Sequence, residues 1–198
     1  MRYFWLAATL VAMLAAPASA VELGLIVGSH SMPHVIDTYG TSRQCVAVGA
    51  SVRQDIGRVT TIGLRAAYTR FYYQEQPGAT LTGGGLAAQA DVLARTQFAA
   101  DRVRVFGGLG FGFDMLSETY KWYNEPETYL WDWLGGRAGL LVGTSISAAS
   151  RVRFGAELGI PVVSAFRGIR NYSSQDATTY RSIGVLSPDI SLTVSYTL

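Results

Sequence analysis

Cysteine, histidine and lysine are scarce in this sequence of 198 residues, which contains Cys45, His30, His34 and Lys121 as its only members of these three types. A single cysteine cannot form a disulfide within the chain, and no base lies near Cys45 in the sequence. We therefore expect Cys45 to be an inert residue in a strand. Charge is nearly balanced, with 16 basic and 14 acidic residues. No basic run points to a nucleic acid as a partner.

Long hydrophobic runs are confined to the start of the chain. Arg2 is followed by the uncharged apolar run 3–16 and by Ala18, Ser19 and Ala20, which form the small-x-small pattern of signal-peptide cleavage. We predict a signal peptide at residues 1–20. An uncleaved anchor is the alternative, but the run is shorter than the about 20 residues of a spanning helix. The longest clearly apolar later stretch without charge, residues 138–150, is also too short to span a membrane as a helix.

Alternation of apolar and polar residues dominates the rest of the chain. In the last segment, Ile190, Leu192 and Val194 fall on one face, and Ser191 and Thr193 fall on the other. A period of two indicates a strand with two different faces. The pattern recurs along the chain and predicts eight strands, at residues 21–28, 45–53, 61–69, 86–93, 103–115, 133–143, 151–163 and 189–198.

The connections between these segments alternate in length. The short ones are residues 54–58, 96–102 and 147–150, and the long ones are residues 30–44, 74–83, 117–130 and 164–181. This alternation predicts an antiparallel up-and-down barrel with tight turns at one rim and long loops at the other. Both termini then lie at the rim with the tight turns.

The face that points outward distinguishes a membrane barrel from a water-soluble one. The apolar faces of the predicted strands carry almost no charge, and the opposite faces carry few Lys or Glu residues, which abound on surfaces in contact with water. Aromatic residues, which favour the membrane interface, gather at the strand ends next to the long loops. These are Tyr72, Tyr73, Tyr120, Trp122, Tyr123, Tyr129, Trp131 and Phe166. We therefore predict a transmembrane β-barrel with its apolar face outward.

The signal peptide, eight alternating strands, short turns at one rim and apolar last strand resemble the OmpA/OmpX-type outer-membrane barrels. The last strand, DISLTVSYTL, is similar to the strand that the outer-membrane assembly machinery recognises, although it ends in Leu198 where an aromatic residue is usual. The resemblance implies an outer-membrane barrel at residues 21–198, with periplasmic termini and extracellular long loops. It implies as partners the lipid or lipopolysaccharide of that membrane and the assembly machinery.

Charged residues fall on the faces expected to line the lumen. Because side chains fill the interior of an eight-stranded barrel, charges enclosed there must pair. Arg65 and Asp91 lie on neighbouring predicted strands, as do Arg137 and Glu157. We predict a polar plugged lumen, and the alternative is a narrow pore in which these charges pair anew to pass small solutes or ions. The residues expected near mid-height are Arg65, Gln89, Asp91, Arg137, Glu157 and Asp189.

Both histidines fall in the first long loop, together with Ser31 and Asp37. His, Ser and Asp are the residue types used in acyl transfer. Some outer-membrane barrels modify lipid A in this way, but the lipid A deacylases place their His and Ser one residue apart on a strand, whereas His30 and Ser31 are adjacent in a predicted loop. We predict a protein that is not an enzyme and has no catalytic residue, metal or cofactor. A lipid A acyl-modifying enzyme is the alternative.

The long connections are rich in aromatic residues and Arg, which are favoured at binding surfaces. A belt at the membrane interface is the alternative explanation for the aromatic residues. We expect a structural or surface-interaction role and an extracellular ligand. The candidate binding residues are Trp122, Tyr123, Tyr129, Arg167, Arg170 and Tyr172.

Overall fold

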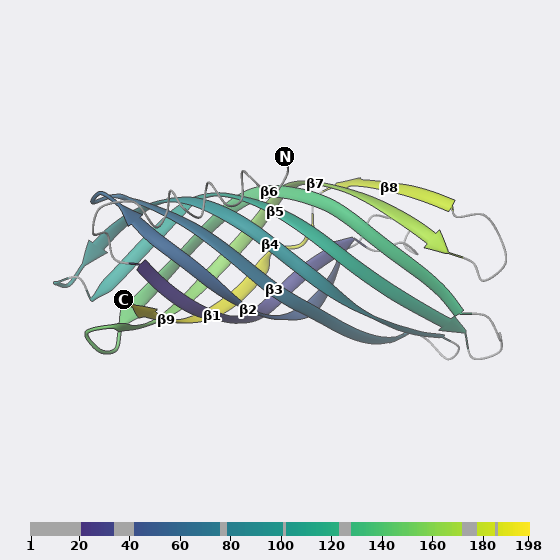
Figure 1. Cartoon of the computed structure of the whole chain (residues 1–198), viewed down its shortest axis with the longest axis horizontal. Coiled ribbons are helices and arrows are strands. Elements are labelled where there is room, and N and C mark those ends of the chain that lie inside the picture. Colours follow the sequence, from purple (N-terminus) through teal and green to yellow (C-terminus); the bar gives the residue numbers. More distant parts are fainter. Residues whose placement is uncertain are drawn as a thin grey trace.

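The computed structural model of the chain describes residues 21–33, 42–75, 79–100, 102–122, 128–171, 178–184 and 186–198. These residues form tilted antiparallel strands that close into a barrel (Figure 1). The strands are β1 (Val21–Pro33), β2 (Ser42–Ile56), β3 (Thr60–Glu75), β4 (Ala79–Phe98), β5 (Val103–Trp122), β6 (Thr128–Ser147), β7 (Val152–Asn171), β8 (Thr178–Gly184) and β9 (Asp189–Thr197). The predicted signal peptide, His34 and Asp37 lie outside the described residues.

Within the described ranges, no helix has the length and hydropathy needed to cross a membrane.

The barrel has eight wall positions, as predicted. Each strand from β1 to β7 pairs antiparallel with the next strand along the chain, and β9 pairs with both β7 and β1 to close the wall. β8 pairs only with the later part of β7, so β8 and β9 share one position. We call the end with the short connections the turn end and the other the loop end. β1 begins and β9 finishes at the turn end, on the left of Figure 1.

The strands extend further toward the loop end than their alternation predicts. β5 was expected at residues 103–115 and continues to Trp122, and β4 and β6 are extended in the same way. The predicted loops 30–44, 74–83, 117–130 and 164–181 are therefore partly strand. Alternation fails there because hydrogen bonding continues where the outward residues are no longer apolar: Met115 is followed on that face by Ser117 and Lys121.

The eighth wall position is interrupted, which the sequence did not predict. β8 begins within the predicted loop 164–181 and continues to Gly184, and Pro188, which has no N–H to donate, lies between β8 and β9. In the described part of the chain, β1 beyond Gly28 has no ladder with β8. Side chains bridge this seam instead. The Ser31 N–H donates to Asp189 Oδ1 over 2.6 Å, the Ile190 N–H donates to Ser29 Oγ over 3.0 Å, and Gln44 Nε2 donates to the Pro188 carbonyl over 2.9 Å.

A β-bulge in β7 reverses the direction of the side chains that follow it. Ala138 of β6 pairs with Val163, but its neighbour Gly139 pairs with Pro161, so Val162 is the extra residue. Phe154 and Val162 point outward, and beyond the bulge Val163 does too. Phe166 therefore lies inside the barrel and is 3% exposed, which corrects its predicted place in the outer aromatic belt.

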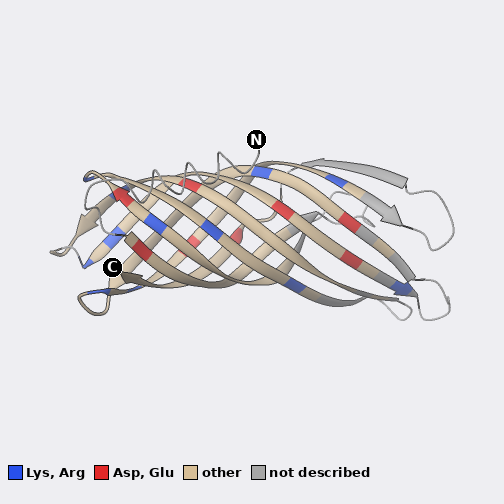
Figure 2. Ribbon diagram, viewed as in Figure 1, with Lys and Arg blue, Asp and Glu red and all other residues tan. Residues whose placement is uncertain are grey.

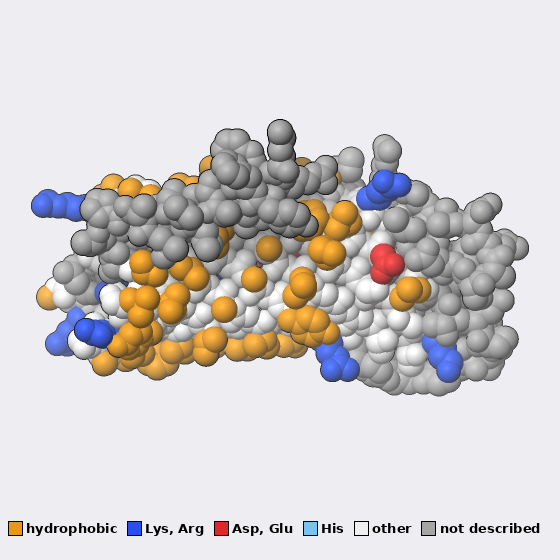
Figure 3. All heavy atoms as spheres, in the orientation of Figure 1, with side chains coloured by type: hydrophobic (Ala, Val, Ile, Leu, Met, Phe, Trp, Pro, Cys, Tyr) orange, Lys and Arg blue, Asp and Glu red, His pale blue; other side chains and the backbone are white. Residues whose placement is uncertain are grey.

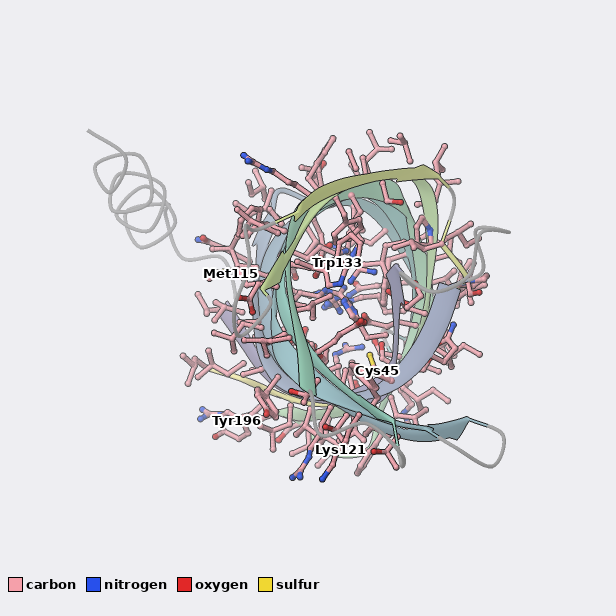
Figure 4. The ribbon with its side chains drawn as sticks, turned by 90° about the vertical axis from the view of Figure 1, so that its right-hand side faces the viewer. Cys45, Met115, Lys121, Trp133 and Tyr196 are labelled. Carbon is pink, nitrogen blue, oxygen red and sulfur yellow. The ribbon has the colours of Figure 1, made fainter. Side chains whose placement is uncertain are left out.

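Apolar side chains cover the outside and most charged side chains lie inside. Leu25 and Leu192 are 67% and 65% exposed, whereas Asp91 and Glu157 are each 3% exposed. Figure 3 shows hydrophobic side chains over the turn-end part of the molecule, and Figure 4 shows Trp133 and Cys45 inside the ring of strands with Met115 and Tyr196 at its periphery. This distribution is that of a transmembrane barrel, whose outer surface contacts lipid.

Candidate functional site: the charged lumen

The charged residues of the lumen form three clusters at successive heights, and Figure 2 shows charged positions along the whole length of the wall. The lower cluster lies near the turn end and joins Glu22, Asp55, Arg95 and Arg104. Arg104 Nη1 lies 3.0 Å from Glu22 Oε2, and Arg95 Nη1 lies 2.5 Å from Asp55 Oδ2. A second contact of 3.4 Å joins Arg104 to Asp55. Two guanidinium groups therefore balance two carboxylates.

The middle cluster joins four strands. Arg53 Nη1 donates to Glu157 Oε1 over 2.6 Å, and Arg65 Nη2 lies 3.0 Å from both Glu157 Oε2 and Asp91 Oδ2. Gln89 Nε2 donates to the other oxygen of Asp91 over 2.7 Å. The cluster again has two positive and two negative groups. Such mutual pairing offsets the cost of removing these charges from water.

The upper cluster contains His30, Asp114, Arg137 and Asp189. Arg137 Nη1 donates to Asp189 Oδ2 over 2.8 Å, and Arg137 Nε lies 3.4 Å from Asp114 Oδ2. His30 Nε2 lies 3.2 Å from Asp114 Oδ1, and Arg137 Nη2 lies 2.5 Å from His30 Nδ1. The same Arg137 Nη2 lies 2.7 Å from His30 Nε2, so the guanidinium contacts both ring nitrogens.

The six residues expected at mid-height are divided between two clusters. Arg65, Gln89, Asp91 and Glu157 meet in the middle cluster, whereas Arg137 and Asp189 belong to the upper cluster. Arg137 and Glu157 lie on neighbouring strands but do not pair, because the register places Arg137 opposite Ser164. Arg53, which also belongs to the middle cluster, is not among the six residues predicted from the sequence.

His30 does not lie in a loop, and this corrects the basis of the enzyme alternative. It lies on β1, is 5% exposed and belongs to the upper cluster. Every second residue of β1 points inward, from Gly24 through Ile26 and Gly28 to His30. Continuing this alternation past Gly28 could have revealed the position of His30. Its ring is buried inside the barrel and does not face the lipid-exposed outer surface.

Apolar side chains separate and cover the charged clusters. Leu93, Phe106 and Leu141 form a buried group between the lower and middle clusters. The Arg53 guanidinium lies 5.0 Å from the centre of the Phe106 ring, within the range of a cation–π contact. Toward the loop end, beyond the upper cluster, the buried apolar residues of the lumen include Phe71, Leu116, Trp133 and Phe166.

Two small cavities touch the charged clusters. Their volumes are about 50 Å³ and 20 Å³, and both are lined by Gln89, Arg137 and Asp189. Spaces of this size hold a few water molecules. Among the described residues, no group of three His, Cys, Asp or Glu side chains is placed to bind a metal ion.

Cys45 lies on β2, inside the wall and opposite His30 of β1. It is buried, and its thiol donates to the His30 carbonyl over 2.8 Å. This is the strand position expected from the sequence.

Of the predicted surface-binding residues, only Arg167 has a described side chain, and it is exposed. Tyr123 and Tyr172 lie outside the described residues, and the side chains of Trp122, Tyr129 and Arg170 are also not described. Among the aromatic residues predicted for the membrane interface, only Phe166 has a described side chain, and it is buried. At the turn end, Phe98 and Tyr196 are exposed on the outer face.

No family model and no curated protein sequence matches this chain. Solved structures do. The N-terminal β-barrel domain of OprF from Pseudomonas aeruginosa aligns with a TM-score of 0.52 at 11% identity, covering 90% of this chain and 97% of that one. A major outer membrane protein from Thermus thermophilus aligns with a TM-score of 0.59 at 12% identity, covering 91% and 100%. At these identities the likeness concerns the fold, which is that of the outer-membrane barrels and agrees with the predicted resemblance.

Proposed function

We propose that this protein is a non-enzymatic barrel of the bacterial outer membrane, with a lumen closed to ions and a surface-interaction role at its loop end. The observation that carries the proposal is the pairing of the lumen charges. Arg53, Arg65 and Arg137 each lie within 3.0 Å of a carboxylate oxygen, and the adjoining cavities measure about 50 Å³ and 20 Å³. A conducting path would require these pairs to separate.

Conductance in planar bilayers tests the closed lumen. We expect no stepwise current from the purified, folded protein. Steps that disappear when Arg65 or Arg137 is changed to Ala would establish the narrow pore and overturn the proposal. Insertion is checked independently by heat-modifiable gel mobility of protein recovered from the same lipid.

The part of the barrel beyond the hydrophobic belt supports an interaction role. On β5 the outward residues are apolar up to Met115, and Ser117 and Lys121 follow. The belt part of β5, residues 103–115, is already long enough for a tilted strand to cross the bilayer, which takes about 9–11 residues. The rest of β5 therefore projects from the membrane as an ordered wall. We propose that the loop end of the barrel presents a set of aromatic and arginine residues to an extracellular ligand. These are Trp122, Tyr123, Tyr129, Arg167, Arg170 and Tyr172.

The proposed orientation places the termini in the periplasm and the loop end outside the cell, with a signal peptide removed after Ala20. Lys121 offers a direct test, because it is the only lysine in the chain and is exposed near the loop end. A membrane-impermeant amine reagent applied to intact cells is expected to label Lys121. Labelling only after the outer membrane is broken would reverse the orientation, and Lys121→Arg provides the blank.

We further propose that the assembly machinery recognises the last strand. β9 presents Ile190, Leu192, Val194 and Tyr196 on its outer face. Changing Tyr196 to Ser is expected to reduce the folded protein recovered from outer membranes, and Tyr196→Phe is expected to preserve it. Equal loss in both variants would exclude an aromatic signal at this position.

A further inference from the structure

A large recess lies on the lipid-facing wall, outside the barrel. It spans β2 to β5 and has a volume of about 590 Å³, more than ten times that of either lumen cavity described above. Figure 3 shows part of this face, where backbone is visible between scattered small hydrophobic side chains. The outward side chains that line the recess are Ala50, Val52, Leu64, Ala66, Ala88, Ala90, Phe111 and Phe113.

The strand register explains the shape of this recess. Ala50 pairs with Ala66, and Ala66 pairs with Ala88, so three small side chains lie in a row across adjacent strands. Ala88 pairs in turn with Phe113, which ends the row with a large ring. The alanines form a shallow floor and the Phe residues of β5 form a wall beside it. The outward residues are all apolar, so a hydrocarbon chain fits this recess chemically.

Toward the loop end, the outward residues of β3 change from apolar to aromatic to cationic. Ala66 in the recess is followed on the same face by Tyr68 and Arg70, and both of these side chains are exposed. Tyr68 leans over Gly84 of β4, where an added Cβ would lie 3.2 Å from its hydroxyl oxygen. Ala66 and Arg70 are separated by about 13 Å at the usual rise of a strand. Within the described ranges, no carboxylate forms an ion pair with Arg70.

This order matches the order of groups in a membrane lipid. Hydrocarbon chains lie in the belt, aromatic rings favour the interface and cations attract anionic headgroups at the surface. We propose that the recess and Arg70 together bind one lipid with an anionic, phosphate-bearing headgroup. Its chain lies against Ala66 and its neighbours, and its phosphate accepts hydrogen bonds from Arg70. The inference rests on the proposed function only in that this wall crosses a membrane.

A second copy of the chain fits the same surface less well. A two-fold axis along the membrane normal would place the two copies of Arg70 at the same height on facing walls. Like charges would then approach each other at the edge of the interface. An anionic lipid complements the same arginine.

Native mass spectrometry of the folded full chain, released from detergent micelles, tests the proposal. The probes are dilauroyl phosphatidylglycerol and dilauroyl phosphatidylcholine, which have the same chains and differ in net headgroup charge. The variants are Ala66→Phe, which fills the recess, and Arg70→Gln, which removes the cation. Ala156→Phe, in β7 four wall positions away, and Arg151→Gln, directly before β7, make the same changes at exposed positions. Heat-modifiable gel mobility verifies that every variant is folded.

The unchanged protein is expected to retain phosphatidylglycerol about fivefold better than phosphatidylcholine, the effect of one arginine near an anionic surface. Arg70→Gln should remove this preference, Ala66→Phe should reduce retention of both lipids, and the two control variants should behave like the unchanged protein. Equal retention of the two lipids, or equal effects of the β3 variants and their controls, would overturn the proposal. So would a dimer that Ala66→Phe dissociates, since it would assign the recess to a second copy. None of these results depends on conductance or on which end faces the cell exterior.

Discussion

The inner and outer sides of β5 place similar residues in two different environments. Phe106 points inward and is 7% exposed, and Phe111 points outward and is 57% exposed. Inside, each side chain is fixed among other protein groups, and a missing partner leaves an unpaired charge or a cavity. Outside, lipid chains are fluid and adapt to the shape of the wall. Lumen substitutions should therefore depend on specific contacts, and lipid-facing substitutions should depend mainly on polarity and depth.

The largest effect is expected at the middle cluster. Glu157→Gln leaves Arg53 and Arg65 without a buried negative partner and should lower the free energy of unfolding by about 3–5 kcal/mol. Urea unfolding in lipid vesicles, followed by gel mobility, measures this. Leu192→Ile on the lipid-facing side is the control and should change stability little. A loss below about 1 kcal/mol for Glu157→Gln would mean that lumen pairing is not what holds the barrel together.

On the outer face, the polarity of the new side chain should determine how much a substitution lowers the free energy of unfolding. Leu25→Arg, in the middle of the belt of β1, should lower the free energy of unfolding by about 2–4 kcal/mol. The same change at Val59, in a turn at the end of the barrel, should cost at most about 1 kcal/mol. Vesicle unfolding compares the two variants. Equal costs at the two sites would contradict the position of the hydrophobic belt.

Two leucines on neighbouring strands allow the contribution of lumen packing to stability to be compared with that of lipid contact. Leu93 is 1% exposed in the lumen and Leu109 is 52% exposed on the outside. Leu93→Ala leaves a cavity among fixed side chains and should lower the free energy of unfolding by at least about 2 kcal/mol. Leu109→Ala should cost less, because lipid fills the space. The comparison fails if Leu109→Ala proves the more destabilising of the two in the same unfolding assay.

The smallest effect is expected in the turn between β4 and β5, which faces neither environment. Ala99 and Ala100 have φ values of 51° and 53°, in the left-handed region that alanine rarely adopts. Ala100→Gly relieves this strain and should raise the free energy of unfolding by about 0.5–1 kcal/mol. Ala94→Gly, within β4, should lower it by a similar amount. Opposite signs in one denaturant series are the expected result.

The fold was predictable because one face of every strand contacts lipid. Alternation revealed the eight wall positions and the direction of the arginines, since a shift of one residue would place charge in hydrocarbon. It could not show where strands end beyond the membrane. There, both faces of β5 carry polar residues while the ladder continues to Trp122. The break before Pro188 was missed for a related reason, since the segment before it alternates poorly.

The sequence predicted which charged side chains point into the lumen better than it predicted which of them pair with one another. Parity placed Arg65 and Asp91 on adjacent strands, and they pair. Arg137 instead contacts Asp189 and His30, because its long side chain reaches across the lumen to strands that are distant in the order. Which carboxylate an arginine reaches depends on strand tilt and stagger, and these are not set by any local pattern.

The bulge at Val162 has a consequence for how this wall tolerates insertions and deletions. Because of this one extra residue, even-numbered residues of β7 point outward before the bulge, and odd-numbered residues point outward after it. Removing Val162 would join Pro161, which points inward, to Val163, which points outward. The ladder with β6 would then become regular, and Phe166 and Arg167 would keep their present directions. A single-codon deletion at this point should therefore perturb the barrel far less than the deletion of one residue within either half of β7, which would turn the neighbouring side chains to the wrong face.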